Sequence, residues 1–206
     1  DGYLNTWYTL KEPGQRWTNL QECHELYSAG HLIEGAVAYY EATGKRAFLD
    51  IMSRMADHID SVFGPEEGKL AGYPGHPEIE LALCRLYTAT GEKRYLNLAK
   101  FFIDARGTQP LYYEEERRRR GGTEHFKGMH SLGPEYAQWH KPLREQDEAV
   151  GHAVRALYLY AGAAHIARET GDQELIRVCE TLWRNTIQRK MYITGAFGAT
   201  HIGEAF

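Results

Sequence analysis

A unit of two helices joined by a Thr-Gly connector occurs three times in this 206-residue chain, and it constrains the fold more than any other feature. The three connectors read Ala-Thr-Gly-Lys-Arg-Ala-Phe-Leu, Ala-Thr-Gly-Glu-Lys-Arg-Tyr-Leu and Glu-Thr-Gly-Asp-Gln-Glu-Leu-Ile. Apolar residues recur at spacings of three and four on both sides of each connector, as they do on the buried face of a helix. A glycine directly after such a run is typical of a helix end.

The repeat predicts an all-α fold of three antiparallel helical hairpins. The expected helices are 20–42 and 46–62, then Gly75-His76-Pro77-Glu78 to Thr90 with proline at an early position, 94–106, 151–170 and 173–190. No strand-like alternation accompanies them. Stacked hairpins form either an open solenoid or a closed α/α toroid, and the repeat alone leaves both open.

A long insertion, roughly residues 107–144, separates the second and third hairpins. It contains the run Glu114-Glu-Glu-Arg-Arg-Arg-Arg120, in which the acidic residues largely offset the basic ones. We therefore expect a solvated loop rather than a nucleic-acid patch. Loops of this length in compact domains are commonly binding loops or lids.

Composition favours one soluble globular domain. Apolar residues make up 43% of the chain and charged residues 25%, with a net charge of −4. This balance gives no reason to expect nucleic acid or a membrane as partner, and no apolar run is long enough to span a bilayer. The aromatic content of 12% suits sugar stacking as well as core packing.

The cysteines indicate neither a disulfide framework nor a metal motif. Cys23, Cys84 and Cys179 are odd in number, far apart and without Cys-x-x-Cys spacing. Cys84 and Cys179 lie within apolar helical patterns, which predicts buried thiols.

Histidines follow glycines at corresponding places in the three repeats. These pairs are Gly30-His31, Gly75-His76 and Gly151-His152, and His24 adds a fourth imidazole before the first pair. If the hairpins stack along a curve, these histidines gather at one mouth and suit a polyhydroxyl ligand. The alternative is that each is a structural cap or an inherited repeat feature. Their spacing does not favour a metal site.

The last candidate is Glu204, the one carboxylate in the Gly-rich segment 192–206. A carboxyl group among Gly, Ala and Phe suits a general acid, because apolar surroundings raise its pKa. The plainer interpretation is a turn with an exposed glutamate.

Several segments, distributed over the whole chain in the same order, resemble glycoside hydrolase family 127, the β-L-arabinofuranosidases. They are Asp1-Gly-Tyr-Leu-Asn-Thr, His24-Glu-Leu-Tyr-Ser-Ala-Gly-His-Leu-Ile-Glu34, Gly72-Tyr-Pro-Gly-His-Pro-Glu-Ile-Glu80, His140-Lys-Pro-Leu-Arg-Glu-Gln146, Val150-Gly-His-Ala-Val-Arg155, Lys190-Met-Tyr-Ile-Thr-Gly195 and Gly203-Glu-Ala-Phe206. One departure is Ala196, where the family usually has a second glycine.

The resemblance implies that residues 1–206 are part of a single catalytic domain with an (α/α)6 barrel, three of whose hairpins are present here, with the N-terminal start and the C-terminal β domains lying elsewhere. It implies removal of terminal β-L-arabinofuranosyl residues with retention of configuration. Glu204 would then be the acid/base, and His24, His76 and His152 would line the sugar pocket, with His31 as a nearby alternative to the first.

The same resemblance implies a zinc cofactor that holds a cysteine thiolate as the nucleophile. The family's zinc ligands follow the Gly-Glu-Ala-Phe motif, and none of the three cysteines here lies in a matching motif, so we expect no metal ligand within residues 1–206. A second carboxylate, as in other retaining glycosidases, would be Glu22, Glu78 or Glu145, and the spacing selects none of them.

Two rival functions stay open at this point. One is another α/α-toroid sugar enzyme, such as an epimerase that uses paired histidines as acid and base. The other is a helical-repeat scaffold that binds protein partners and has scattered histidines. For the favoured glycosidase we expect an L-arabinofuranosyl substrate, a homodimer, a bacterial cytoplasmic location, and no activity of residues 1–206 alone.

Overall fold

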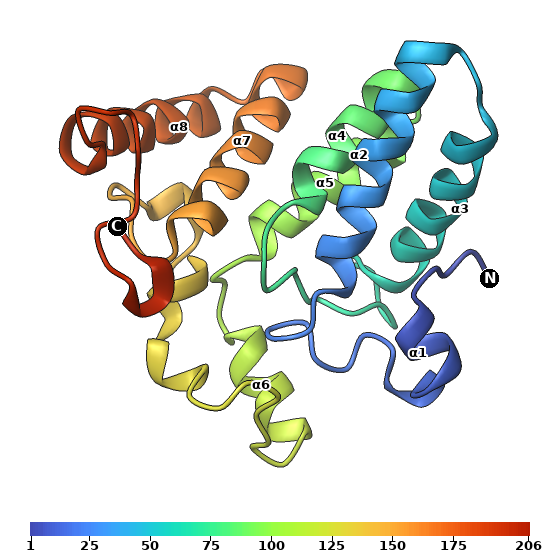
Figure 1. The fold of residues 1–206 in the computed structure, drawn as a ribbon, viewed down its shortest axis with the longest axis horizontal. Helices are drawn as coiled ribbons and strands as arrows, with labels where there is room; N and C mark the ends of the chain where they lie inside the picture. The colour runs from blue at the N-terminus through green and yellow to red at the C-terminus, as the bar shows by residue number, and fades with distance from the viewer.

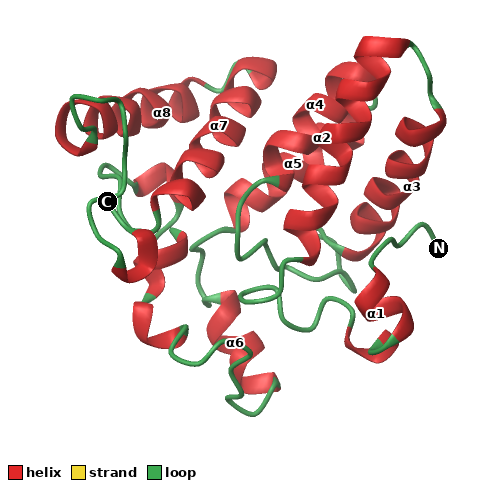
Figure 2. Cartoon of the chain, viewed as in Figure 1, coloured by secondary structure: helices red, strands yellow, loops and turns green.

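The computed structural model describes residues 1–206 and consists of helices joined by loops, without a β-sheet (Figure 2). Its α-helices are α1 (Thr6–Leu10), α2 (Glu25–Thr43), α3 (Ala47–Val62), α4 (Ile79–Thr90), α5 (Lys93–Ala105), α6 (Tyr112–Arg119), α7 (Ala153–Thr170) and α8 (Gln173–Asn185). Short 3-10 turns are Pro13–Gln15, His130–Leu132, Pro134–Ala137, Leu143–Glu145 and Ile202–Glu204, and Thr186–Lys190 is a π-helical turn. The all-α prediction is confirmed.

The helices form three hairpins, α2/α3, α4/α5 and α7/α8, that stand side by side (Figure 1). The first helices of the hairpins pack in chain order, with α4 between α2 and α7, and each packs against its own partner α3, α5 or α8. The result is consistent with three consecutive hairpins of an (α/α)6 barrel. No helix is long and apolar enough to cross a membrane.

The Thr-Gly connectors end their helices by one shared mechanism. Each threonine hydroxyl, in Thr43, Thr90 and Thr170, donates a hydrogen bond of 2.6–2.7 Å to the carbonyl four residues earlier. Each following glycine has a left-handed backbone, with φ of 70° at Gly44, 78° at Gly91 and 68° at Gly171. Glycine adopts this conformation without a steric penalty, so the chain reverses at once into the next helix.

One continuous core lies between the first helices of the hairpins (α2, α4 and α7) and their partners (α3, α5 and α8). On α3 the buried side chains are Leu49, Met52, Met55 and Ile59, at the three- and four-residue spacing of a single helix face. Of the thiols, Cys84 is fully buried as predicted, whereas Cys179 and Cys23 are only half-buried, and none of them forms a disulfide.

Two helix starts differ from the prediction. α2 begins at Glu25 rather than near Leu20, and residues 20–23 form a turn. α4 begins at Ile79, because Glu78 has an extended φ of 176° and serves as its N-cap residue. Pro77 therefore precedes the helix instead of occupying its first turn.

The insertion is a packed scaffold, and the prediction of a solvated loop is wrong for its first half. It contains α6, whose Glu116 is buried and accepts hydrogen bonds from the backbone N–H groups of Leu20 (2.7 Å) and Gln21 (3.2 Å). In return, Glu22 accepts hydrogen bonds from the N–H groups of His125 and Phe126. Glu116 of the run thus anchors the turn that leads into α2.

A buried arginine joins the other end of the insertion to the second hairpin. Arg106 donates hydrogen bonds to the carbonyls of Ala137 (2.8 Å) and Pro74 (2.7 Å) and lies 3.4 Å from the Glu80 carboxylate. Both members of this ion pair are fully buried. Because a buried charge is costly unless it is paired and hydrogen-bonded, this network specifies where the insertion sits.

Candidate functional site

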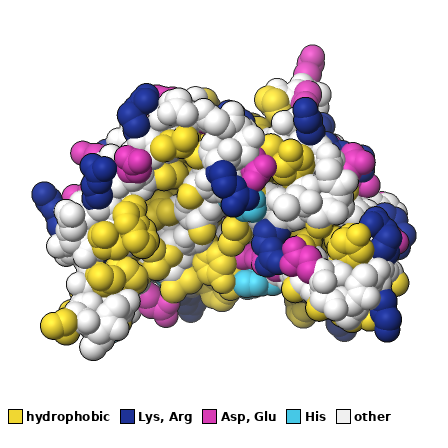
Figure 3. Space-filling view, turned by 90° about the horizontal axis from the view of Figure 1, so that it is seen from above, with side chains coloured by type: hydrophobic (Ala, Val, Ile, Leu, Met, Phe, Trp, Pro, Cys, Tyr) yellow, Lys and Arg dark blue, Asp and Glu magenta, His cyan; other side chains and the backbone are white.

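Three of the predicted histidines meet at the starts of the three hairpins. His24 is the N-cap residue of α2, His76 precedes α4, and His152 is the N-cap residue of α7. The ring centroids of His24 and His76 are 5.9 Å apart, and those of His76 and His152 are 5.7 Å apart. These three rings form a row. Histidine side chains on the face in Figure 3 lie near its middle, beside acidic and basic groups.

The glycines before His76 and His152 allow the hairpin starts to interlock. A Cβ on Gly75 would overlap the carbonyl oxygens of Leu20 and Gln21, and Gly75 N–H donates to the first of these at 2.9 Å. Gly151 has a φ of +72°, and a Cβ there would overlap the carbonyl of Glu135. Only glycine permits such close backbone approach.

His31 does not join this row. It lies in the second turn of α2, and Tyr27 separates it from His76, with ring-centroid distances of 4.4 Å to each. Its Nδ1 lies 3.7 Å from Glu78 Oε1, and its side chain is 43% exposed. The prediction that Gly30-His31 corresponds to Gly75-His76 and Gly151-His152 is therefore wrong. His24 occupies the position equivalent to His76 and His152, because α2 begins later than predicted.

Glu204 lies against the third histidine. Its Oε2 is 2.9 Å from His152 Nε2. The backbone of the loop is held by an antiparallel bridge between His152 and Ala205, and by a hydrogen bond of 3.1 Å from Phe206 N–H to the Gly151 carbonyl. Glu204 itself has a φ of +47°, which is strained for a residue with a side chain. The remaining surface of its carboxylate faces solvent, with 74% of the side chain exposed.

Arg155 is a site residue that the sequence reasoning missed. Its guanidinium is buried, donates to the Gly75 carbonyl at 2.6 Å and to the Tyr136 hydroxyl at 3.4 Å, and lies 4.6 Å from the centre of the Tyr136 ring. No carboxylate pairs with it. The quoted motif from Val150 to Arg155 contains this arginine, but its burial beneath the histidines depends on the packing of α7.

Burial and this cation keep the histidines neutral. Burial, together with a smaller contribution from the charge of Arg155, lowers the pKa of His76 to about 3. Burial followed by Arg155 also lowers the pKa of His24 and of His152. Since each imidazole loses affinity for a proton, the row presents neutral rings that both donate and accept hydrogen bonds.

The partners of two rings define their tautomers. Nδ1 of His76 lies 2.8 Å from the Pro77 carbonyl, which can only accept, so this nitrogen carries the proton and Nε2 is left as an acceptor. Nδ1 of His152 instead accepts the backbone N–H of Arg155 at 3.2 Å, so its proton lies on Nε2, which faces Glu204. The two rings thus carry opposite hydrogen-bonding roles.

Aromatic side chains flank the histidine row on one side. Tyr27 is on α2, three residues after His24, and Tyr158 is on α7, with its ring centroid 5.8 Å from that of His76. Neither was predicted as a site residue. The spacing from His24 to Tyr27 is one helical turn, a signal that was available in the sequence.

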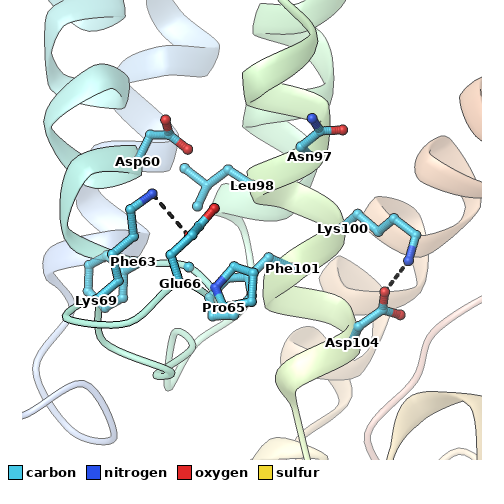
Figure 4. A pocket seen from close by; sticks show the side chains of 11 residues that line it. Asp60, Phe63, Pro65, Glu66, Lys69, Asn97, Leu98, Lys100, Phe101 and Asp104 are labelled. Atoms are coloured by element: carbon cyan, nitrogen blue, oxygen red, sulfur yellow. Dashed lines mark hydrogen bonds and ion pairs between the residues drawn. The ribbon is translucent and has the colours of Figure 1, made fainter.

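A separate cavity of about 410 Å³ lies between the end of α3 and α5 (Figure 4). It contains none of the predicted site residues. Four of the charged residues that line the cavity form two ion pairs: Lys69 pairs with Glu66 at 3.2 Å, and Lys100 pairs with Asp104. Their charges therefore neutralise one another. This cavity shows no unpaired set of groups with catalytic chemistry.

The residues of this chain do not fit a zinc–thiolate centre. No three His, Cys, Asp or Glu side chains lie close enough together to hold a metal ion. Burial raises the pKa of the Cys84 thiol to about 12 and that of Cys179 to about 11, which disfavours the thiolate that a metal requires. No catalytic step through zinc follows from these residues.

Helical hairpins whose starts meet around neutral imidazoles and one carboxylate are consistent with part of an (α/α)6 barrel protein. The family model described as "Beta-L-arabinofuranosidase, GH127 catalytic domain" matches residues 1–206. The chain belongs to this family.

Relatives agree with this membership. The chain is 47% identical over 210 residues to the "Non-reducing end beta-L-arabinofuranosidase" of Bifidobacterium longum subsp. longum, covering 100% of this chain and 32% of that protein. The structure of this chain matches that of a GH127 beta-L-arabinofuranosidase from Geobacillus stearothermophilus T6 with a TM-score of 0.96 and 57% identity. The match covers 100% of this chain and 32% of that one. A further GH127 beta-arabinofuranosidase matches with a TM-score of 0.84 and 45% identity, over 100% of this chain and 30% of its own. The chain thus spans about a third of their length.

Proposed function

We propose that the protein containing this chain is a glycoside hydrolase that removes terminal β-L-arabinofuranosyl residues with retention of configuration. The observation that carries the proposal is the row of neutral histidines ending at Glu204, within a chain of this family. Neutral imidazoles hold the hydroxyl groups of a sugar without attracting an ionic ligand. We infer that the carboxyl group at one end of the row acts at the glycosidic oxygen.

In this proposal Glu204 is the acid/base. As an acid it donates a proton to the leaving-group oxygen, and as a base it later takes a proton from the attacking water. His24, His76 and His152 bind and orient the sugar ring, whereas His31, which lies beyond Tyr27, orients the neighbouring Tyr27 and Tyr158 rings.

None of the carboxylates considered from the sequence suits the nucleophile. Glu22 accepts hydrogen bonds from Asn19, His125 and Phe126 and is occupied by the scaffold. Glu78 is buried, and burial raises its pKa to about 9, so it is neutral at ordinary pH. Glu145 is exposed in a 3-10 turn of the insertion. We propose that the zinc-bound cysteine implied by the family resemblance is supplied by other parts of the protein.

The test is Glu204→Gln in the natural polypeptide that contains this chain. The amide keeps the shape but cannot transfer a proton, so we expect turnover of an arabinofuranoside with a poor leaving group to fall about 10²–10⁴-fold. The exposed Glu67→Gln is the control and should leave turnover unchanged. Near-normal turnover of Glu204→Gln would refute the acid/base role.

The two rival functions make different predictions. A binding scaffold predicts scattered histidines, which does not match the row described above. An epimerase would invert a carbinol centre and release no sugar, so product analysis by NMR separates it from a hydrolase. The expected bacterial cytoplasmic homodimer is tested by light scattering of the purified polypeptide and by cell fractionation.

A further inference from the structure

We propose that His152 is a positioning residue for Glu204: it holds Oε2 of the carboxyl group, so that the proton transferred in catalysis resides on Oε1. The proposal rests on the acid/base role of Glu204 proposed above. It assigns to this histidine a task beyond contact with the sugar, and it assigns separate tasks to the two oxygens of one carboxyl group.

The direction of the hydrogen bond follows from the start of α7. The Arg155 N–H is one of the helix N–H groups that lack a partner within the helix, and it donates to His152 Nδ1 at 3.2 Å. A neutral imidazole that accepts at one nitrogen carries its proton on the other. His152 Nε2 therefore donates to Glu204 Oε2 across the 2.9 Å contact. An oxygen that accepts this bond is not the one that carries the acid proton.

Without His152, nothing would hold the Glu204 side chain. The contact with Nε2 is the only polar interaction of its carboxylate. The backbone is held at the next residue, by the His152–Ala205 bridge and by the hydrogen bond of 3.1 Å from Thr200 N–H to the Ala205 carbonyl. The φ of +47° at Glu204 is strained, so it depends on these contacts. Because the backbone is held and the Glu204 side chain has no other polar contact, the His152 imidazole is the group that selects the rotamer of Glu204.

The groups around His152 favour its neutral form. The His76 ring lies 5.7 Å away, the Tyr136 ring lies 5.5 Å away, and Arg155 follows on the same helix. Of these only Arg155 is charged, and it opposes protonation of the ring, whereas Glu204 favours it. Burial is the larger effect and lowers the pKa of His152. A neutral donor orients the carboxyl group without holding it permanently ionised, as a full ion pair would.

Two substitutions in the natural polypeptide separate the functions of the two ring nitrogens. His152→Asn retains an oxygen that can cap α7 but is too short to reach Glu204. His152→Gln places an amide N–H near the position of Nε2 and restores the donor. The readout is the basic limb of the pH profile of kcat/KM, which reports the pKa of the acid in the free enzyme.

We expect His152→Asn to lower kcat about tenfold or more and to move the basic limb upward by about one pH unit. The sign follows because a hydrogen-bond donor stabilises the ionised form of a carboxyl group, so loss of the donor moves the limb to higher pH. His152→Gln should keep the limb near its natural position. The control is His165→Asn, which removes a histidine that lies 3.7 Å from Glu169 on the same helix and should change neither quantity.

If His152→Asn raises only KM and leaves the basic limb in place, the positioning role is overturned. His152 would then be a sugar contact only. This outcome is distinct from failure of the proposed function. If Glu204→Gln is inactive while the limb of His152→Asn does not move, Glu204 is the acid and only the positioning role is lost. If Glu204→Gln is active, the acid/base assignment itself falls.

Discussion

Single residues in this protein carry protonation states that their neighbours determine. Glu78 is the clearest case: it is fully buried, its Oε2 has no hydrogen-bond partner, and the backbone of α2 passes over it at Gly30. Burial raises its pKa to about 9, with further contributions from Glu34 and Glu80. A neutral carboxyl group is tolerated here, whereas a buried carboxylate would have only the His31 imidazole, 3.7 Å away, as a possible counterion.

This state makes folding stability depend on pH. The folded pKa of Glu78 lies above its ordinary value of 4.5, so its contribution to stability is fully present below pH 4.5 and is lost as pH rises through about 9. In the Glu78→Gln variant the side chain is neutral at every pH, so its contribution to stability is not lost as the pH rises. Its stability advantage over the natural polypeptide should therefore grow between pH 5 and pH 9, by up to about 1.4 kcal/mol per pH unit. Thermal unfolding at both pH values, with the exposed Glu67→Gln as control, measures the difference; an advantage independent of pH would show that Glu78 is ionised in the folded state.

At the scale of elements, α2 contains two glycines with opposite roles. A Cβ on Gly30 would overlap the Glu78 carboxyl group and crowd the start of α4. Gly35 lies on the same helix, and a Cβ there would meet only the Phe48 ring, at an ordinary contact distance of 3.8 Å. The first glycine brings two helices together, and the second has no such function.

Alanine at these two positions should act in opposite directions. Gly30→Ala forces α2 away from α4 and should lower the free energy of unfolding by about 1–3 kcal/mol. Gly35→Ala reduces the freedom of the unfolded chain at a place with room for a methyl group, and it should raise the free energy of unfolding by about 0.5–1 kcal/mol. Chemical denaturation of each variant gives both values. Equal effects of the same sign would mean that α2 and α4 are not in close contact at Gly30.

At the scale of the whole molecule, one face of the third hairpin is apolar and open. A groove of about 430 Å³ between α7 and α8 is lined by Leu157, Tyr160, Ala161, Ala164, Cys179, Glu180, Trp183 and Thr186. Figure 3 shows hydrophobic side chains on the side of the molecule that α7 and α8 occupy in Figure 1. The relatives are about three times as long as this chain, which covers 32% of them. We expect a further part of the protein to cover this face.

Trp183 tests this expectation, because it is 62% exposed here. In the natural polypeptide, Trp183→Ala should lower the free energy of unfolding by about 3 kcal/mol or more, as for a tryptophan in a core. Its exposed neighbour Arg184 provides the control, and Arg184→Ala should change stability by less than about 0.5 kcal/mol. A Trp183→Ala variant as stable as the control would show that the face remains in solvent.

The sequence by itself predicted the three hairpins and their ends, because helix periodicity and the Thr-Gly terminus depend on residues one turn apart. It also predicted that the histidines of the three Gly-His pairs gather at one end of the array, because equivalent positions of stacked repeats coincide, and the family resemblance assigned His24 and Glu204 to the same site. The predicted helix starts were less accurate. The N–H groups of Leu20 and Gln21 donate to Glu116 in the distant insertion, so residues 20–23 form a turn before α2.

Only the tertiary structure decided which groups act together at this end and in which protonation state. His31 is excluded from the row by Tyr27, Glu78 is held neutral by burial, and the uncompensated charge of Arg155 lies beneath the histidines. These properties arise from contacts between residues that are far apart in the chain. They depend on burial and on distance, and no local pattern encodes either.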